Sequence, residues 1–186
     1  MNLRRPITCH RVFNMPSATT FAIPAIGDFV RSYLKKAKSS VDPFARNCNW
    51  ATYTNDIDPR TSAQSHMDAV DFLNDLHKRN VTVSLAFFDP PYSPSQYAEH
   101  YRSIEKKVFL EDYQDGRIRR RVRDAIDRIM EPQGIVLSFG WQSMGMGIKR
   151  NYTPIEILLV THGGSHNDTI CLAERKNQSL QFSMSL

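Results

Sequence analysis

Val81–Phe88, which reads VTVSLAFF, runs directly into Asp89-Pro90-Pro91-Tyr92. A mostly apolar run of this length is typical of a β-strand that is covered on both faces, as in a parallel sheet. Proline has a fixed φ and no backbone N–H, so the paired prolines are expected to end the strand. The stretch therefore predicts a buried central strand with an acidic, stiff turn at its carboxyl end.

Helical and strand patterns alternate on both sides of this strand. Apolar residues recur at helical spacing after Pro24, and further helices are expected at about 69–79 and 113–130. Other expected strands end at about Asp42 or cover residues 51–56, 135–139, 155–161 and 169–174. This alternation predicts an α/β fold with a mostly parallel sheet and helices on both faces. Because only a short loop joins the last two strands, we expect them to form a C-terminal antiparallel hairpin.

Composition narrows the class of protein. The chain has 186 residues, 41% hydrophobic and 23% charged, which is ordinary for one globular domain. Residues 1–20 are interpreted as a basic N-terminal arm and residues 21–186 as a single domain. No apolar run is long enough for a membrane span, and no apolar stretch follows the basic start, so a cytoplasmic protein is predicted.

Charge and cysteine content point to the kind of partner. The formal net charge of +5 gives a modest preference for polyanions such as nucleic acids. The three cysteines, Cys9, Cys48 and Cys171, lie far apart in the sequence. We therefore predict neither a disulfide framework nor a metal site.

Acidic residues follow the expected strands at the points where those strands end. Asp42, Asp56 and Asp89 each come after a strand, and Asp68 stands just before the second helix. In open α/β sheets, ligands bind beyond the carboxyl ends of the strands. The sequence therefore predicts an acidic ligand site at this rim of the sheet.

The Asp89-Pro90-Pro91-Tyr92 turn suggests a specific chemistry. The prolines hold the Asp89 carboxylate and the Pro90 carbonyl as rigid acceptors beside the Tyr92 ring. Two acceptors and a stacking ring suit a planar group that carries an NH2. The alternative is a simple tight turn in which Tyr92 packs on the core.

Phe88–Tyr92 resembles the catalytic motif of the S-adenosylmethionine-dependent amino methyltransferases, which methylate adenine N6 or cytosine N4 in DNA. The likeness extends from about Phe21 to Arg175 and is greatest to small phage-encoded adenine methyltransferases acting in a bacterial host. It implies a Rossmann-like class I methyltransferase sheet, S-adenosylmethionine as cofactor, and Asp89, Pro90, Pro91 and Tyr92 as catalytic residues. The cofactor-binding residues that it implies are Phe21, Asp42, Pro43, Phe44, Ala45, Asp56, Ile57, Asp68, Ala69 and Asp89.

The sequence departs from this family in two places. The usual Gly-x-Gly of the cofactor loop is replaced by Ala45-Arg46-Asn47, where Asn47 is expected to take the left-handed conformation. The chain also has no room for a separate target-recognition domain. The consequence is either relaxed specificity or recognition shared with a second subunit or a second copy of the chain.

Basic and aromatic residues after the catalytic turn are candidates for nucleic-acid contacts. They are Tyr92, Arg117, Arg119, Arg120, Arg121, Trp141, Lys149 and Arg150. The alternatives are a solvated helix start for the arginines and a linker with Trp141 packed inside. The resemblance implies methyl transfer to the N6 amine of an adenine flipped out of DNA. RNA or cytosine-N4 methylation, or an inactive binding protein with this fold, are the competing hypotheses.

Overall fold

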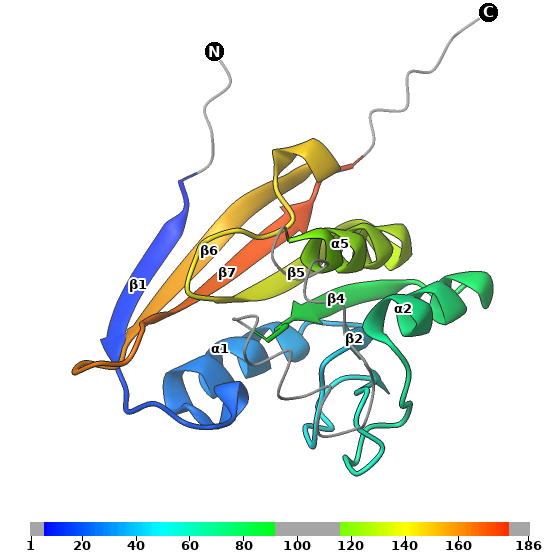
Figure 1. Ribbon diagram of the computed structural model, residues 1–186. Coiled ribbons are helices and arrows are strands. Elements are labelled where there is room, and N and C mark those ends of the chain that lie inside the picture. The colour runs from blue at the N-terminus through cyan, green and yellow to red at the C-terminus, as the bar shows by residue number, and fades with distance from the viewer. Residues whose placement is uncertain (1–5, 92–115, 179–186) are drawn as a thin grey trace, which may run out of the picture.

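The structure, a computed structural model, describes residues 6–91 and 116–178 (Figure 1). Three helices and seven strands form its frame, together with two short 3-10 turns. The helices are α1 (Pro24–Leu34), α2 (Ala69–Lys78) and α5 (Arg117–Ile129). The strands are β1 (Thr8–Phe13), β2 (Ser40–Asp42), β3 (Tyr53–Thr54), β4 (Val83–Phe88), β5 (Met130–Gly140), β6 (Tyr152–Thr161) and β7 (Thr169–Lys176).

All seven strands belong to one sheet, in the order β1-β6-β7-β5-β4-β2-β3. Strand β7 runs antiparallel to both of its neighbours, β5 and β6. Every other neighbouring pair is parallel. The predicted mostly parallel sheet with a C-terminal antiparallel hairpin is therefore confirmed.

Helices cover both faces of the sheet and create two cores. Alternate residues of β4 enter different cores: Leu85 and Phe87 pack with α1, whereas Ala86 and Phe88 pack with α2 and α5. All four of these side chains are buried. The prediction that the apolar run 81–88 is covered on both faces is confirmed, although the strand itself begins at Val83. Among the described residues, no helix combines the length and apolar character needed to cross a bilayer.

Part of the expected N-terminal arm belongs to the sheet, which corrects that expectation. Thr8–Phe13 forms β1 and pairs in parallel with β6 at the sheet edge. Asn14 anchors the exit from this strand, since its backbone N–H donates to Thr161 O at 3.1 Å. Its side-chain oxygen accepts from the backbone N–H of Ala25 in the first turn of α1. The strand is mostly exposed, so it carries no apolar run that would reveal it in the sequence.

Candidate functional site

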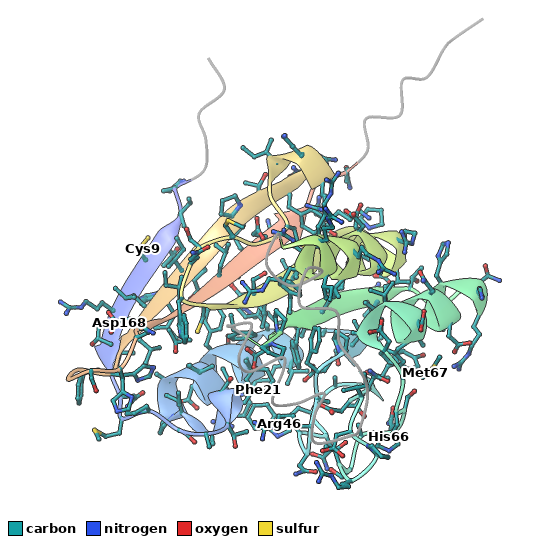
Figure 2. All side chains as sticks on the ribbon, in the orientation of Figure 1. Cys9, Phe21, Arg46, His66, Met67 and Asp168 are labelled. Atoms are coloured by element: carbon teal, nitrogen blue, oxygen red, sulfur yellow. The ribbon has the colours of Figure 1, made fainter. Side chains whose placement is uncertain are left out.

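A large cavity opens where β2 and β4 end. Its volume of about 750 Å³ falls within the range usual for cofactor sites. Asp42 closes β2 and Asp89 follows β4, so both carboxylates come from carboxyl ends of neighbouring parallel strands. The segment 17–21, before α1, lines the same cavity. In Figure 2, Phe21 and Arg46 lie close together below the sheet, with Met67 and His66 on the loop that leads to α2.

The structure brings all ten predicted cofactor-binding residues to this cavity. They are Phe21, Asp42, Pro43, Phe44, Ala45, Asp56, Ile57, Asp68, Ala69 and Asp89. They come from five separate segments of the chain, and only the fold unites them. The expected convergence of acidic side chains on one rim is therefore observed.

Asp42 is the most buried of the aspartates that line the cavity, with only 2% of its surface exposed. Its carboxylate accepts a hydrogen bond from the Phe44 N–H at 3.0 Å and so shapes the turn that follows β2. Burial raises the pKa of Asp42 to about 8, the Phe44 bond opposes this rise, and the nearby charges of Asp89 and Asp56 add to it. An acid with this pKa holds a proton at neutral pH when no cation is near.

The loop after β2 turns without glycine. Arg46 takes the left-handed conformation, with φ of 50°. Asn47, where the sequence predicted this conformation, does not adopt it, so the prediction was wrong by one residue. The Arg46 N–H donates to the Asp56 carboxylate at 3.1 Å, and the Ala45 N–H donates to Asn55 O at 2.8 Å. These two bonds join the loop to the segment after β3 and explain why the left-handed residue falls at Arg46.

Asn55 ties three segments of the cavity wall together, although sequence reasoning gave it no role of its own. Its side chain is fully buried. Its amide group donates to Pro43 O at 3.2 Å and to Met67 O at 3.0 Å. Its side-chain oxygen accepts from the Met67 N–H at 3.0 Å. The sequence signal for this role was the position of Asn55 directly after a strand and just before Asp56 and Asp58.

The remaining acids have different local partners. Asp58 holds the Arg60 guanidinium with contacts of 2.6 to 3.1 Å, so this pair largely cancels its own charge. Asp68 caps α2 by accepting from the Val70 N–H at 2.9 Å. Within residues 6–91 and 116–178, no three His, Cys, Asp or Glu side chains gather so that they could hold a metal ion.

A second, smaller cavity of about 70 Å³ lies on the other side of the proline turn. Pro90 lines both cavities, so the two spaces meet at this turn. The small cavity is lined by Phe88, Pro90, Arg119, Arg123, Phe139, Gly140, Trp141, Gln142 and Met144. Arg119 donates to Pro91 O at 2.8 Å and so fixes the turn to α5. Tyr92, predicted to be the stacking ring, lies outside the described residues.

The arginine run at the start of α5 divides into two groups. Arg119 and Arg123 are half-buried and line the small cavity, whereas Arg117, Arg120 and Arg121 are exposed. The first turn of α5 holds no acidic residue, and Gly116 at its N-cap offers no side-chain cap. Positive side chains at a helix N-terminus add to the positive end of the helix dipole. Positive charge is therefore concentrated at this end of α5.

The loop between β5 and β6 presents large side chains to solvent. Trp141 is 43% exposed and Met144 63%, which contradicts the alternative that Trp141 is packed inside. Lys149 is exposed as well. Arg150 differs, because it pairs with Asp124 at 2.6 Å and donates to Met146 O at 3.0 Å. Its guanidinium therefore braces the loop, which argues against its predicted role as a surface contact.

Two residues that sequence reasoning missed hold this loop in place. The buried carboxylate of Glu174, on β7, accepts from the backbone N–H groups of Met146 and Gly147. Arg123 donates to Gly145 O at 2.7 Å and lies over the Phe88 ring. Glu174 is distant in sequence from the loop and stands in a strand, so no local pattern indicated its role.

Comparison with known proteins bears on the fold. No family model and no curated protein matches the sequence. Among solved structures, the chain is similar to NSun6 from Pyrococcus horikoshii, solved with SFG, at TM-score 0.53 and 11% identity, covering 76% of this chain and 48% of that one. It is similar to TrmN from Thermus thermophilus at TM-score 0.51 and 12% identity, covering 83% and 49%. A Haemophilus influenzae protein provisionally termed a methylase gives TM-score 0.50 and 11% identity, covering 86% and 100%.

These likenesses confirm the predicted Rossmann-like α/β fold. At such low identity they establish the fold and nothing about the reaction. The chain spans about half the length of NSun6 and TrmN.

Replacing Asn55 with alanine is expected to lower the free energy of unfolding by about 2–4 kcal/mol. Three backbone groups of Pro43 and Met67 would lose their partner, and each buried unpaired group costs about 1–3 kcal/mol. Chemical denaturation measures the loss. The matched control is Asn47→Ala, which removes one exposed bond to the Ser62 N–H. Equal losses in the two variants would contradict the role of Asn55.

The stability of the protein should depend on pH through Asp42. Its folded pKa of about 8 means that the folded state keeps a proton that the unfolded state releases above about pH 4. The free energy of unfolding therefore falls as pH rises from about 4 to 8, by up to about 1.4 kcal/mol per unit. Asp42→Asn keeps an acceptor for the Phe44 N–H but cannot ionise, so it should lack this dependence.

Denaturation at about pH 5 and about pH 8 measures this difference. Asp71→Asn, at an exposed position of α2, is the matched control and should follow the unaltered protein. An Asp42→Asn variant as sensitive to pH as the unaltered chain would show that Asp42 ionises normally.

Proposed function

We propose that the protein transfers a methyl group from S-adenosylmethionine to the exocyclic N6 amine of adenine in DNA. The observation that carries this proposal is the position of Pro90, which lines both the large acidic cavity and the small cavity beside the arginines. At such a turn, a donor held in the large cavity can meet an acceptor that enters from the side of the small cavity. The acceptor motif, Asp89-Pro90-Pro91-Tyr92, begins at this wall.

The large cavity fits S-adenosylmethionine by its size and by its charge. Its described lining holds five aspartates, and a cationic ligand with sugar hydroxyls suits acceptors of this kind. When bound, S-adenosylmethionine supplies a methyl group on a positively charged sulfur, activated for transfer. Phe21 stacks on Trp50, with ring centroids 5.9 Å apart, and provides an apolar wall before α1. A bound cation would also favour the ionised form of Asp42.

The chemistry assigned to the proline turn is proton acceptance and positioning. The Asp89 carboxylate and the Pro90 carbonyl accept the two N–H bonds of the amine, which directs its lone pair toward the donor. As the new C–N bond forms and the C–S bond breaks, Asp89 accepts the proton that the nitrogen releases. A carboxylate cannot deprotonate a neutral amine in advance. Positioning, which contributes on the order of 7–11 kcal/mol, is therefore the larger effect.

Adenine reaches this turn only after it leaves the duplex. Base flipping costs a few kcal/mol, and stacking on aromatic rings offsets about 1–3 kcal/mol per base. We assign this stacking to Tyr92, at the end of the catalytic motif. Trp141 lines the small cavity and is 43% exposed, so it lies where it can contact the flipped base or its neighbour.

The DNA surface that we propose surrounds the small cavity. It consists of Arg117, Arg120 and Arg121 on α5, together with Trp141 and Lys149 between β5 and β6. Arginines near the helix N-terminus are placed to bind phosphates. This surface is small, so we propose either short target sequences or recognition shared with a second copy or another subunit.

Methylation assays on separate nucleic acids test this function. The full chain is incubated with labelled S-adenosylmethionine and either duplex DNA or RNA, and the modified nucleoside is identified by mass spectrometry. N6-methyldeoxyadenosine is the expected product. Methylation of RNA alone, or formation of N4-methylcytosine, would show the same chemistry on another substrate. Either result would overturn the DNA adenine proposal. Absence of both S-adenosylmethionine binding and methyl transfer would favour the competing hypothesis of a catalytically inactive protein that binds nucleic acid or another partner.

Asp89→Ala should abolish methyl transfer and leave S-adenosylmethionine binding within a few-fold of the unaltered protein. Proton transfer to a positioned group contributes about 100- to 10,000-fold to a rate. The isosteric variant Asp89→Asn keeps the size of the side chain and should also be inactive. Asp71→Ala, exposed on α2, is the control. Full turnover by either Asp89 variant would remove Asp89 from the reaction.

Reversing the charge of Arg120 and Arg121 should weaken DNA binding and flatten its dependence on salt. Each lost phosphate contact lowers the slope of log affinity against log salt by about 0.9. The matched control is Lys35→Glu with Lys36→Glu, which makes the same charge change at exposed positions after α1, on the opposite face of the sheet. If both double variants reduced the slope equally, net charge alone would explain the effect.

A further inference from the structure

Arg46 has a backbone conformation that an arginine rarely adopts. Its φ of 50° lies in the left-handed region, which glycine occupies readily and other residues occupy at a cost of about 1–2 kcal/mol. Backbone strain of this kind tends to occur at functional sites. Among the described residues, no carboxylate forms an ion pair with its side chain. The arginine side chain therefore calls for an explanation of its own.

The side chain of Arg46 reaches across the large cavity. Its Nη1 donates to Ala18 O at 3.1 Å, so the guanidinium joins the loop after β2 to the segment before α1. Both residues line the cavity, and Figure 2 shows Arg46 beside Phe21. A guanidinium has five N–H donors in a fixed plane. The bond to Ala18 uses one donor and leaves others available to a ligand.

The charges that line the cavity make Arg46 distinctive. The described lining holds five aspartates and two cations, Arg46 and Arg60. Arg60 is held by both oxygens of Asp58. Arg46 is thus the cation of the described lining that is not ion-paired with a carboxylate. An anionic group entering this cavity would be repelled by the acids unless it met Arg46.

The amino-acid end of S-adenosylmethionine carries such an anionic group, its α-carboxylate. We infer that the guanidinium of Arg46 binds this carboxylate through charge-assisted hydrogen bonds, an inference that rests on the function proposed above. The aspartates then attract the positive charges of the ligand, while Arg46 selects ligands that possess the carboxylate. The Arg46 side chain would thereby bind the ligand at a position of the loop after β2 where a glycine could offer only its backbone groups.

Calorimetry with two ligands on two forms of the full chain tests this assignment. S-adenosylmethionine and decarboxylated S-adenosylmethionine differ only by the carboxylate. The unaltered protein should bind S-adenosylmethionine about 10- to 100-fold more tightly than the decarboxylated form. In Arg46→Gly this preference should nearly disappear, because only the affinity for the ligand with the carboxylate should fall. Arg46→Lys, which keeps the charge without the planar fork, should recover part of the preference.

Thermal unfolding without ligand separates binding from structure. Arg46→Gly places glycine at a positive φ and should keep or raise the unfolding midpoint while it weakens S-adenosylmethionine binding. Asn80→Gly, at another positive φ after α2, is the matched control and should leave both affinities unchanged.

Two outcomes would overturn the inference while leaving the proposed function in place. If Arg46→Gly lost affinity for both ligands equally, Arg46 would act by shaping the loop rather than by binding the carboxylate. An unchanged preference in Arg46→Gly would place the carboxylate elsewhere. Failure of the unaltered protein to bind either ligand would instead overturn the proposed function itself, and this inference with it.

Discussion

The burial of β4 on both faces is the constraint on which the site depends. Leu85 and Phe87 enter one core and Ala86 and Phe88 enter the other, so β4 can neither shift its register nor rotate without exposing one of them. Full burial of each large side chain contributes about 1.5–3 kcal/mol. The chain leaves this strand at Asp89 and meets two prolines at once. The position of the turn is therefore set by the two cores, and its shape is set by the prolines.

The acidic cavity carries a second constraint, which concerns charge. Burial raises the pKa of Asp42, and the nearby charges of Asp89 and Asp56 add to this rise, so the ionised form is unfavourable when no cation is bound. Hydrogen bonds from Phe44 to Asp42 and from Arg46 to Asp56 keep the acids in place despite their mutual repulsion. A cationic ligand would relieve the repulsion. The same groups that strain the empty site would then favour its occupation, which is how a preformed polar site gains selectivity for charge.

The sequence allowed the central part of this arrangement to be predicted, because the signals were local. The apolar run before Asp89 and the acids after each strand indicated both the buried strand and the rim where the ten cavity residues meet. Strand β1 was missed because it is an exposed edge strand whose partner, β6, lies far along the chain. The pairing of Arg150 with Asp124 and the contacts of Glu174 with Met146 likewise join distant residues. The left-handed residue was misplaced because Asn47 has the better intrinsic preference, whereas the bond from Arg46 to Asp56 decides the matter.

The two cavities are built from different halves of the chain, and this division has consequences for how the site works. Loops after β2, β3 and β4 form most of the acidic cavity, whereas α5 and the loop after β5 form most of the small one. Arg119 connects these halves, since it extends from α5 to the carbonyl of Pro91. The position of α5 is thus tied to the turn that would hold the amine, while Asn55 anchors the loops that carry the aspartates of the larger cavity. Under the proposed function, substitutions in α5 and in the loop after β5 would act mainly on the acceptor, although Ile118 and Val122 of α5 also line the larger cavity.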